Sequence, residues 1–446
     1  MKEEIWKRIL MILVIATLNV FLLPQFTTIF EEKPLKGTFY PKPDIHISTD
    51  NWFSGNYALI KESYLVENFG FRNSIIRITN QIKFSAFNQT TAQDVVIGKS
   101  GYLYEQKYIN AINGADFVGE KKILETVTIF KNLQTKLKSL NKHLLIALAP
   151  SKAQYFQEYL PSEINTNAIT NYKVYKKFLI ANNINFIDIN QLFLNLKQKK
   201  IQYPLYPQTG THWSIYSMHL ALDSINAKIG KLINKKLLPF SYPVKNWSDS
   251  LRTPDGDMAE ALNLIFEPKH YPMPYPEIVC PQMDSGYYKP NVLTVSDSYW
   301  MGIYFTHLPQ LTYNNHQFWY YNKKVFSYGD QYDNTDVESH LLNKEILKYD
   351  IIMIMASEAQ LDKIGWEFPN RLLIALNEVK IDATENSANI MPITQIEINH
   401  KKNQIKNNKE WYKLIITKAV ELKISTDSML VLDAIYMIKE ERKKIK

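Results

Sequence analysis

The chain has almost no cysteine: Cys280 is the only one in 446 residues. A single cysteine excludes an internal disulfide framework and any metal site built from several cysteines. It does not decide the compartment, because many exported bacterial proteins use none. His307, His316 and His400 show no ligand spacing with any acidic residue. We therefore expect neither a metal nor a cofactor.

The chain also lacks a concentrated basic region, although its formal net charge is +8. The densest basic runs are KQKK at 197–200, Lys401–Lys402 and the tail at 440–446, and none is interleaved with a nucleic-acid-binding motif. Such runs are typical of solvated faces, so we expect no nucleic-acid partner. A hydrophobic content of 46% and an aromatic content of 13% indicate a packed globular protein.

The amino terminus carries the longest apolar stretch, Ile9–Leu23, which only Thr17 and Asn19 interrupt. It is short for a membrane-spanning helix and also fits the apolar core of a signal peptide. No cleavage site of small residues follows. The basic residues Lys2, Lys7 and Arg8 precede the stretch. We therefore expect an uncleaved signal anchor over residues 1–30, a single pass through the bacterial inner membrane with the rest in the periplasm.

Four regions follow from composition and periodicity: the anchor at 1–30, a tether with helices at 31–90, an α/β domain at 91–378, and a helical carboxyl-terminal extension at 379–446. Buried strands alternate with helices in the third region, which predicts a parallel sheet between two helical layers. Residues 236–290 hold many of the prolines and are expected to form a long insertion with little regular structure. The expected sheet strands are 143–149, 186–189, 292–295 and 350–355.

Ser298 lies just past the carboxyl end of the expected strand 292–295, where open α/β sheets place their ligands. Its ordinary interpretation is a helix N-cap, because Ser and Asp are favoured caps. His212 lies in the turn-like stretch TGTHWS at 209–214 and is equally compatible with a structural role. Taken together, the two predict a serine nucleophile with a histidine base, since a serine hydroxyl attacks only when a base takes its proton.

The third member of such a triad, a carboxylate that orients the imidazole, has no adjacent candidate: Gly210 stands two residues before His212. Either a backbone carbonyl or a distant carboxylate must then orient the ring. Asp188 is a weak candidate at a strand end. Asp255 and Asp257 lie in TPDGDMAEALNL, which reads first as a turn.

Several aromatic residues could form stacking platforms for sugars, and an aromatic-rich core is the alternative. We assign possible substrate binding to Trp213, Tyr299 and Trp300. The run FWYYN at 318–322 has the same two interpretations.

Five segments in order resemble the AlgX/AlgJ-like family of alginate O-acetylation proteins, which carry a domain similar to SGNH hydrolases. They are DVVIGKSGYLYE (94–105), APSKAQYFQEYLP (149–161), THWS (211–214), VSDSYW (295–300) and MIMASEAQL (353–361). The resemblance covers most of the chain from about residue 51. It departs at Gly210, where the family's catalytic Asp is expected, and at Ser296, where the serine motif commonly has Gly.

The resemblance implies a three-layer, flavodoxin-like α/β domain in which Ser298 is the nucleophile and His212 the base. It implies O-acetylation of an exported or cell-surface polysaccharide, with acetyl groups supplied through a membrane-bound O-acyltransferase partner. Two other functions stay open. The chain could be a carbohydrate esterase, or a non-catalytic glycan-binding or scaffold component, which the absence of Asp at 210 favours.

Overall fold

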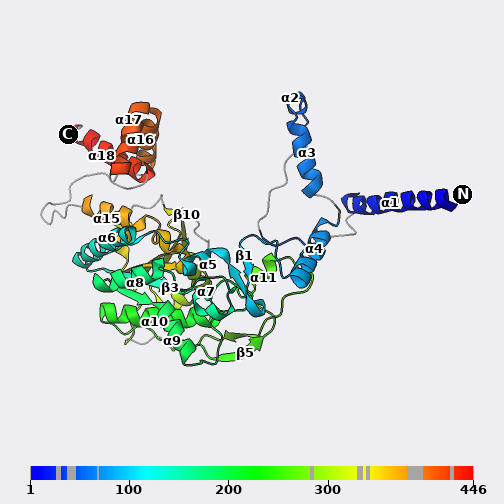
Figure 1. Ribbon diagram of the computed structural model, residues 1–446. Helices are drawn as coiled ribbons and strands as arrows, with labels where there is room; N and C mark the ends of the chain where they lie inside the picture. The colour runs from blue at the N-terminus through cyan, green and yellow to red at the C-terminus, as the bar shows by residue number, and fades with distance from the viewer. Residues whose placement is uncertain are drawn as a thin grey trace.

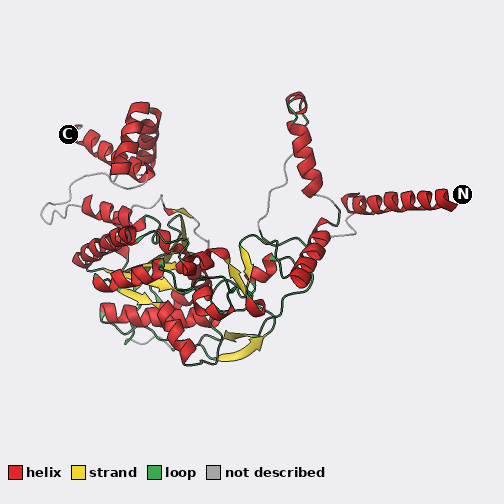
Figure 2. Cartoon of the chain, in the orientation of Figure 1, coloured by secondary structure: helices red, strands yellow, loops and turns green. Residues whose placement is uncertain are grey.

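A seven-stranded β-sheet forms the centre of the α/β region (Figures 1 and 2). This computed structural model describes residues 2–26, 32–37, 47–67, 70–281, 286–328, 335–337, 342–378, 395–421 and 426–444. The strand order is β10-β9-β8-β7-β11-β3-β4. The strand bounds are β3 (His143–Ala149), β4 (Phe186–Asp188), β7 (Asn291–Ser296), β8 (Asn315–Tyr320), β9 (Lys324–Ser327), β10 (Thr335–Asp336) and β11 (Ile351–Ser357).

The central strands are buried on both faces, because their side chains alternate between two cores. In β3, Leu145, Ala147 and Ala149 enter one core, whereas the residues between them enter the other. One core lies under α6 (Glu120–Ser139), α8 (Asn171–Ala181) and α15 (Phe368–Glu378). The other lies under α5 (Gln106–Asn113), α9 (Ile189–Gln198), α10 (Ile215–Ile233) and α12 (Ser298–Phe305). The expected three-layer α/β arrangement is confirmed.

The sheet is mixed: the four predicted strands pair in parallel as expected, but an antiparallel strand pair follows at one edge. β4, β3, β11, β7 and β8 run parallel to one another, whereas β9 pairs antiparallel with β8 and β10 pairs antiparallel with β9. Only residues 321–323 connect β8 to β9, with Tyr321 and Asn322 at positive φ. So short a turn reverses the chain, whereas a parallel crossover needs about a dozen residues.

The proline-rich stretch 236–290 holds more regular structure than expected. β5 (Val244–Ser248) pairs antiparallel with β6 (Met273–Pro276), and α11 (Asp257–Ala261) lies between them. β1 (Val95–Ile97) and β2 (Leu103–Glu105) form another two-stranded sheet. The remaining short elements of the α/β region are η1 (Lys99–Gly101), α7 (Lys152–Tyr155), η2 (Gln157–Tyr159), α13 (Leu308–Thr312), α14 (Leu342–Glu345), η4 (Ile346–Lys348) and η5 (Glu358–Lys363).

The amino-terminal helices are α1 (Lys2–Phe26), α2 (Thr49–Phe53), α3 (Asn56–Glu67) and α4 (Arg72–Phe87). Across the described residues, no helix combines the length and apolar content that a membrane crossing requires, so the predicted anchor at 1–30 is not supported.

The last three helices pack around a small core of their own. They are α16 (Gln395–Asn407), α17 (Lys409–Glu421) and α18 (Thr426–Lys444). Ile405, Ile415 and Leu430 are among its buried members. Residues 379–394, which belong to the extension predicted at 379–446, lie outside the described residues.

Candidate active site

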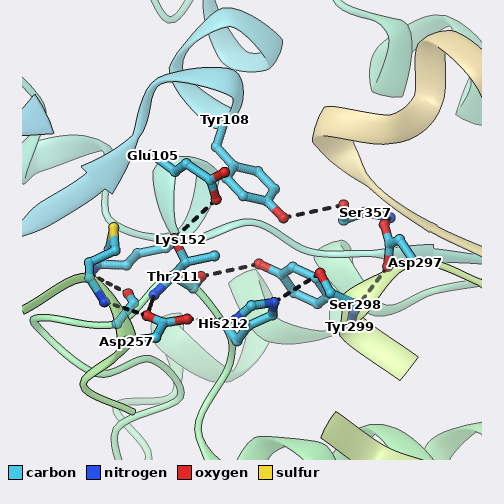
Figure 3. Close-up of polar contacts among 12 residues, drawn as sticks. Glu105, Tyr108, Lys152, Thr211, His212, Asp257, Asp297, Ser298, Tyr299 and Ser357 are labelled. Atoms are coloured by element: carbon cyan, nitrogen blue, oxygen red, sulfur yellow. Dashed lines mark hydrogen bonds and ion pairs between the residues drawn. The ribbon is translucent and has the colours of Figure 1, made fainter. Parts of the chain in front are cut away.

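Ser298 is the first residue of α12, immediately beyond the carboxyl end of β7 (Figure 3). The preceding Asp297 is the N-cap, and its side chain accepts a hydrogen bond from the backbone N–H of Tyr299 at 3.0 Å. Its other carboxylate oxygen accepts from the N–H of Ser357, at the end of β11, at 2.9 Å. Asp297 therefore ties the ends of two neighbouring strands together and holds the start of α12 rigidly.

His212 lies in the loop that leads into α10 and meets Ser298 directly. Its Nε2 is 2.9 Å from the Ser298 Oγ. The two residues are 86 positions apart in the chain, and the parallel topology brings them to the same sheet edge. The structure thus places the predicted nucleophile and base within hydrogen-bonding reach.

Asp257 supplies the carboxylate that the sequence around His212 lacks. Its Oδ2 is 2.9 Å from the Nδ1 of His212, and its Oδ1 accepts from the N–H groups of Thr211 and Met258 at 2.8 Å each. Because a carboxylate only accepts hydrogen bonds, the Nδ1 of His212 carries the proton. The Nε2 is then free to accept from Ser298. Ser298, His212 and Asp257 form an arrangement with the geometry of a triad.

From the sequence, Asp257 is interpreted only as part of a turn and is not assigned to the triad, because it lies 45 residues after His212 in the proline-rich stretch. The interpretation of TPDGD as a turn is correct, since the N–H of Asp257 donates to the carbonyl of Pro254. That turn presents Asp257 at the first position of α11. The other candidates lie elsewhere: Asp188 caps α9 and pairs with Lys176, and Asp255 is buried.

The position of Gly210 has no room for the side chain of an aspartate. A Cβ atom there would lie 2.5 Å from the carbonyl oxygen of Asp255 and 2.9 Å from its carbonyl carbon. Gly210 allows the His212 loop to pack against the turn that carries Asp257. The carboxylate comes from the segment that packs against this loop, and glycine makes the close approach of the two segments possible.

Lys152 supports the same loop from the sheet side. Its Nζ donates to the carbonyl oxygens of Gln208 and Gly210, each at 2.8 Å. The side chain is buried, and this burial lowers its pKa well below the ordinary lysine value. The loop therefore has fixed carbonyl contacts on one side and Asp257 on the other.

The aromatic residues assigned to substrate binding do not form a surface. Trp213, Tyr299 and Trp300 are each 0% exposed. Tyr299 packs against the rings of His212 and Trp213, at centroid distances of 5.3 and 5.0 Å. All three belong to the core behind the site, because apolar contact with the sheet outweighs any role at the surface. Phe318 and Trp319 of the FWYYN run are buried in β8 as well.

Among the described residues, no group of three or more His, Cys, Asp or Glu side chains is arranged to hold a metal ion. The candidate site consists of Ser298, His212 and Asp257 with their backbone supports.

Residues 95–285 match the family model for the SGNH hydrolase-like domain of the acetyltransferase AlgX, which confirms the resemblance. The matched segment includes His212 and Asp257 and ends before Ser298. The chain is 26% identical over 174 residues to the probable alginate O-acetylase AlgJ of Pseudomonas aeruginosa, covering 38% of this chain and 41% of that protein. It is 20% identical over 178 residues to the Pseudomonas putida protein of the same name, covering 40% and 44%.

The matches thus span about two-fifths of the length of these relatives. Among solved structures, the O-acetyltransferase domain of Pseudomonas putida AlgJ aligns over 63% of this chain and 99% of that chain, with 16% identity and a TM-score of 0.42. Pseudomonas aeruginosa AlgX aligns over 64% and 67%, with 12% identity and a TM-score of 0.43.

Proposed function

Because residues 95–285 match the family model for the SGNH hydrolase-like domain of the acetyltransferase AlgX, we propose that this chain O-acetylates a polysaccharide through an acyl-serine intermediate on Ser298. The relatives whose names specify alginate O-acetylation support the choice of reaction. The observation that carries the proposal is the chain of two 2.9 Å contacts from Asp257 through His212 to Ser298.

In the first half-reaction, the Ser298 Oγ attacks the carbonyl carbon of an acetyl ester while the Nε2 of His212 takes the hydroxyl proton. A C–O bond forms to Ser298, the bond to the donor alcohol breaks, and His212 returns the proton to that alcohol. The Ser298 N–H at the start of α12 is the proposed donor to the oxyanion. Asp257 stabilises the imidazolium that forms between the two proton transfers.

In the second half-reaction, a sugar hydroxyl attacks the acetyl-serine, gives its proton to His212 and leaves as the acetyl ester. The proton then returns to the Oγ of Ser298. Water in place of the sugar hydroxyl would make the chain a carbohydrate esterase, so the two functions differ only in the acceptor. The absence of Asp at 210 no longer favours a non-catalytic scaffold, because Asp257 supplies a carboxylate to the Nδ1 of His212.

The test is acylation of the purified chain with an activated acetyl ester, followed by peptide mass spectrometry. We expect one acetyl group on Ser298, released faster when an oligosaccharide acceptor is added. Ser298→Ala and His212→Ala should each abolish the adduct. Ser162→Ala, at an exposed serine away from the site, should leave it intact. Full acylation of the Ser298→Ala variant would overturn the proposed mechanism.

We also propose that the chain acts outside the cytoplasm and receives acetyl groups from a membrane-bound acyltransferase. The basic residues Lys2, Lys7 and Arg8 before the apolar run support export of the remainder. A reporter that functions only after export, fused after residue 60, should be active. An active cytoplasmic reporter at the same position would contradict the proposed location.

A further inference from the structure

A cavity of about 580 Å³ opens from the candidate active site, and Ser298 and His212 line one end of it. It runs along α12, whose residues Met301, Gly302 and Phe305 follow Ser298 at one-face spacing. On the facing helix α10 it is lined by Ile215, Met218 and His219. The helices that begin next to the nucleophile and the base therefore also form the walls of one groove.

The walls of this groove are uncharged and mainly apolar. Among the described residues that line it, none is Lys, Arg, Asp or Glu. Burial lowers the pKa of His219 to about 4, so this side chain is neutral at neutral pH. Phe305 and Ile278, also in the lining, are 51% and 36% exposed and give the groove an apolar mouth.

The groove is much larger than an acetyl group. A cavity of about 150 Å³ is sufficient to bind benzene, which is itself larger than acetyl. The volume of about 580 Å³ falls within the range of pockets that hold drug-sized ligands. Acetyl transfer alone would leave most of this apolar surface in contact with water.

A sugar ring is a poor occupant for the groove, because its hydroxyl groups need hydrogen-bond partners. The hydroxyl of Thr306, one of the few polar groups in the lining, already donates to the carbonyl of Ile303 and accepts from the N–H of Leu308. An alkyl chain attached to the carbonyl that Ser298 attacks would enter the groove without bringing hydroxyl groups that need hydrogen-bond partners.

We propose that this groove binds the acyl chain of the substrate, and that the protein transfers acyl groups longer than acetyl. The inference rests on the proposed acyl-Ser298 mechanism and changes only the acyl group. The Ser298 Oγ still forms the bond to the carbonyl carbon, and the donor alcohol still leaves with the proton from His212. The alkyl chain lies between α10 and α12 during both half-reactions.

The experiment compares p-nitrophenyl esters from acetate through butanoate and hexanoate to octanoate, using the full chain. Burying one methylene contributes about 0.8 kcal/mol, so kcat/KM should rise about three- to fourfold per added methylene until the groove is filled. A second series keeps the acetyl group and lengthens an alkyl alcohol instead. We expect no comparable rise in that series.

Two variants test the walls. Phe305→Ser should lower the hexanoate-to-acetate ratio of kcat/KM by about fivefold. Leu311→Ser, at a 43% exposed apolar residue outside the lining, should leave that ratio unchanged. Gly302→Ala should also lower the ratio, because a Cβ there would lie 2.7 Å from the Met218 Cε and displace that side chain.

The outcomes separate the two proposals. Turnover of acetate with a flat or falling response to acyl length would overturn the acyl groove and leave the proposed function standing. A rise with alcohol length alone would assign the groove to the leaving group and also overturn the inference. If wild-type protein processes no ester and Ser298 is never acylated, the proposed function itself fails. Thermal unfolding of each variant shows that a changed ratio comes from folded protein.

Discussion

Asp257 holds the imidazole of His212 in the one tautomer that leaves Nε2 able to take a proton from Ser298. An amide at the same place would accept through one atom and donate through the other, which permits the wrong tautomer. Replacing the corresponding carboxylate in a serine protease lowers kcat by about 10⁴. We expect Asp257→Asn to lower ester turnover by a similar factor, measured as the steady-state release of p-nitrophenol.

The matched control for this substitution is Asp249→Asn, at an exposed aspartate in the same proline-rich stretch. It should turn over esters like the wild type. Circular dichroism should show that the Asp257→Asn variant stays folded, because the amide preserves the shape of the side chain. Full activity of a folded Asp257→Asn variant would remove Asp257 from the mechanism.

Gly210 supports the site because, without a side chain, it lets the His212 loop pack closely against the backbone of Asp255. Gly210→Ala should cost about 1–3 kcal/mol of unfolding free energy, as overpacking does, because the backbone of Asp255 cannot yield easily. Gly210→Asp should be destabilised as well and should not gain turnover, since His212 already has a carboxylate partner.

Gly256→Ala is the control in denaturant unfolding, because a Cβ there meets only the Leu251 side chain at 3.4 Å or more. A Gly210→Asp variant of wild-type stability with raised turnover would show that the carboxylate of Asp257 does not serve His212.

At the scale of the elements, Glu358 joins three segments at the carboxyl edge of the sheet. It follows β11, accepts a hydrogen bond from Ser151, the N-cap of α7, and is also hydrogen-bonded to Asn190 in α9. Burial raises the pKa of Glu358 from 4.5 to about 7. Burial in the folded state therefore stabilises the protonated form of Glu358 relative to the charged form.

This raised pKa predicts how stability depends on pH. The folded pKa lies above the unfolded value, so the contribution of the bound proton is fully present below about pH 4.5. As the pH rises from about 4.5 to about 7, this contribution is lost and the free energy of unfolding falls by about 3 kcal/mol. Glu358→Gln, which keeps both hydrogen-bonding positions without titrating, should flatten that decline and be more stable than the wild type at pH 8.

Denaturant unfolding at half-unit pH steps measures the effect, with Glu163→Gln at an exposed glutamate as the control. The control should follow the wild-type curve. If Glu358→Gln loses stability from pH 4.5 to 7 as steeply as the wild type, Glu358 is not the group that titrates.

At the scale of the whole molecule, the sheet domain and the last three helices have separate cores. The buried clusters on the two faces of the sheet contain no residue of α16, α17 or α18 in the described chain. We expect a chain ending at Glu378 to fold and to turn over small esters like the full protein. Esterase kinetics and a cooperative thermal melt check this.

A calorimetric scan of the full chain should correspondingly show a second, smaller transition that the shortened chain lacks. A shortened chain that loses its cooperative melt or its turnover would show that the helices stabilise the sheet domain.

The sequence by itself determined the layered α/β architecture and the pair Ser298 and His212. The strand His143–Ala149 is apolar in every residue after His143, as burial on both faces of a parallel sheet requires. Ser298 and His212 also have local sequence signals, since Ser298 begins α12 and His212 lies in a short motif three residues before α10. These features depend on residues that are close together in the chain, so the sequence pattern is sufficient to predict them.

Only the tertiary structure decided the third member of the site, the burial of the aromatic residues and the reversal of the sheet edge. Asp257 reaches His212 across 45 residues, through the packing of one loop against Gly210. Trp213, Tyr299 and Trp300 face the core because α10 and α12 pack on the same side of the sheet. Such contacts form between segments that are distant in the chain. Residue type and local spacing do not show which distant segments pack together, so the sequence alone could not predict these contacts.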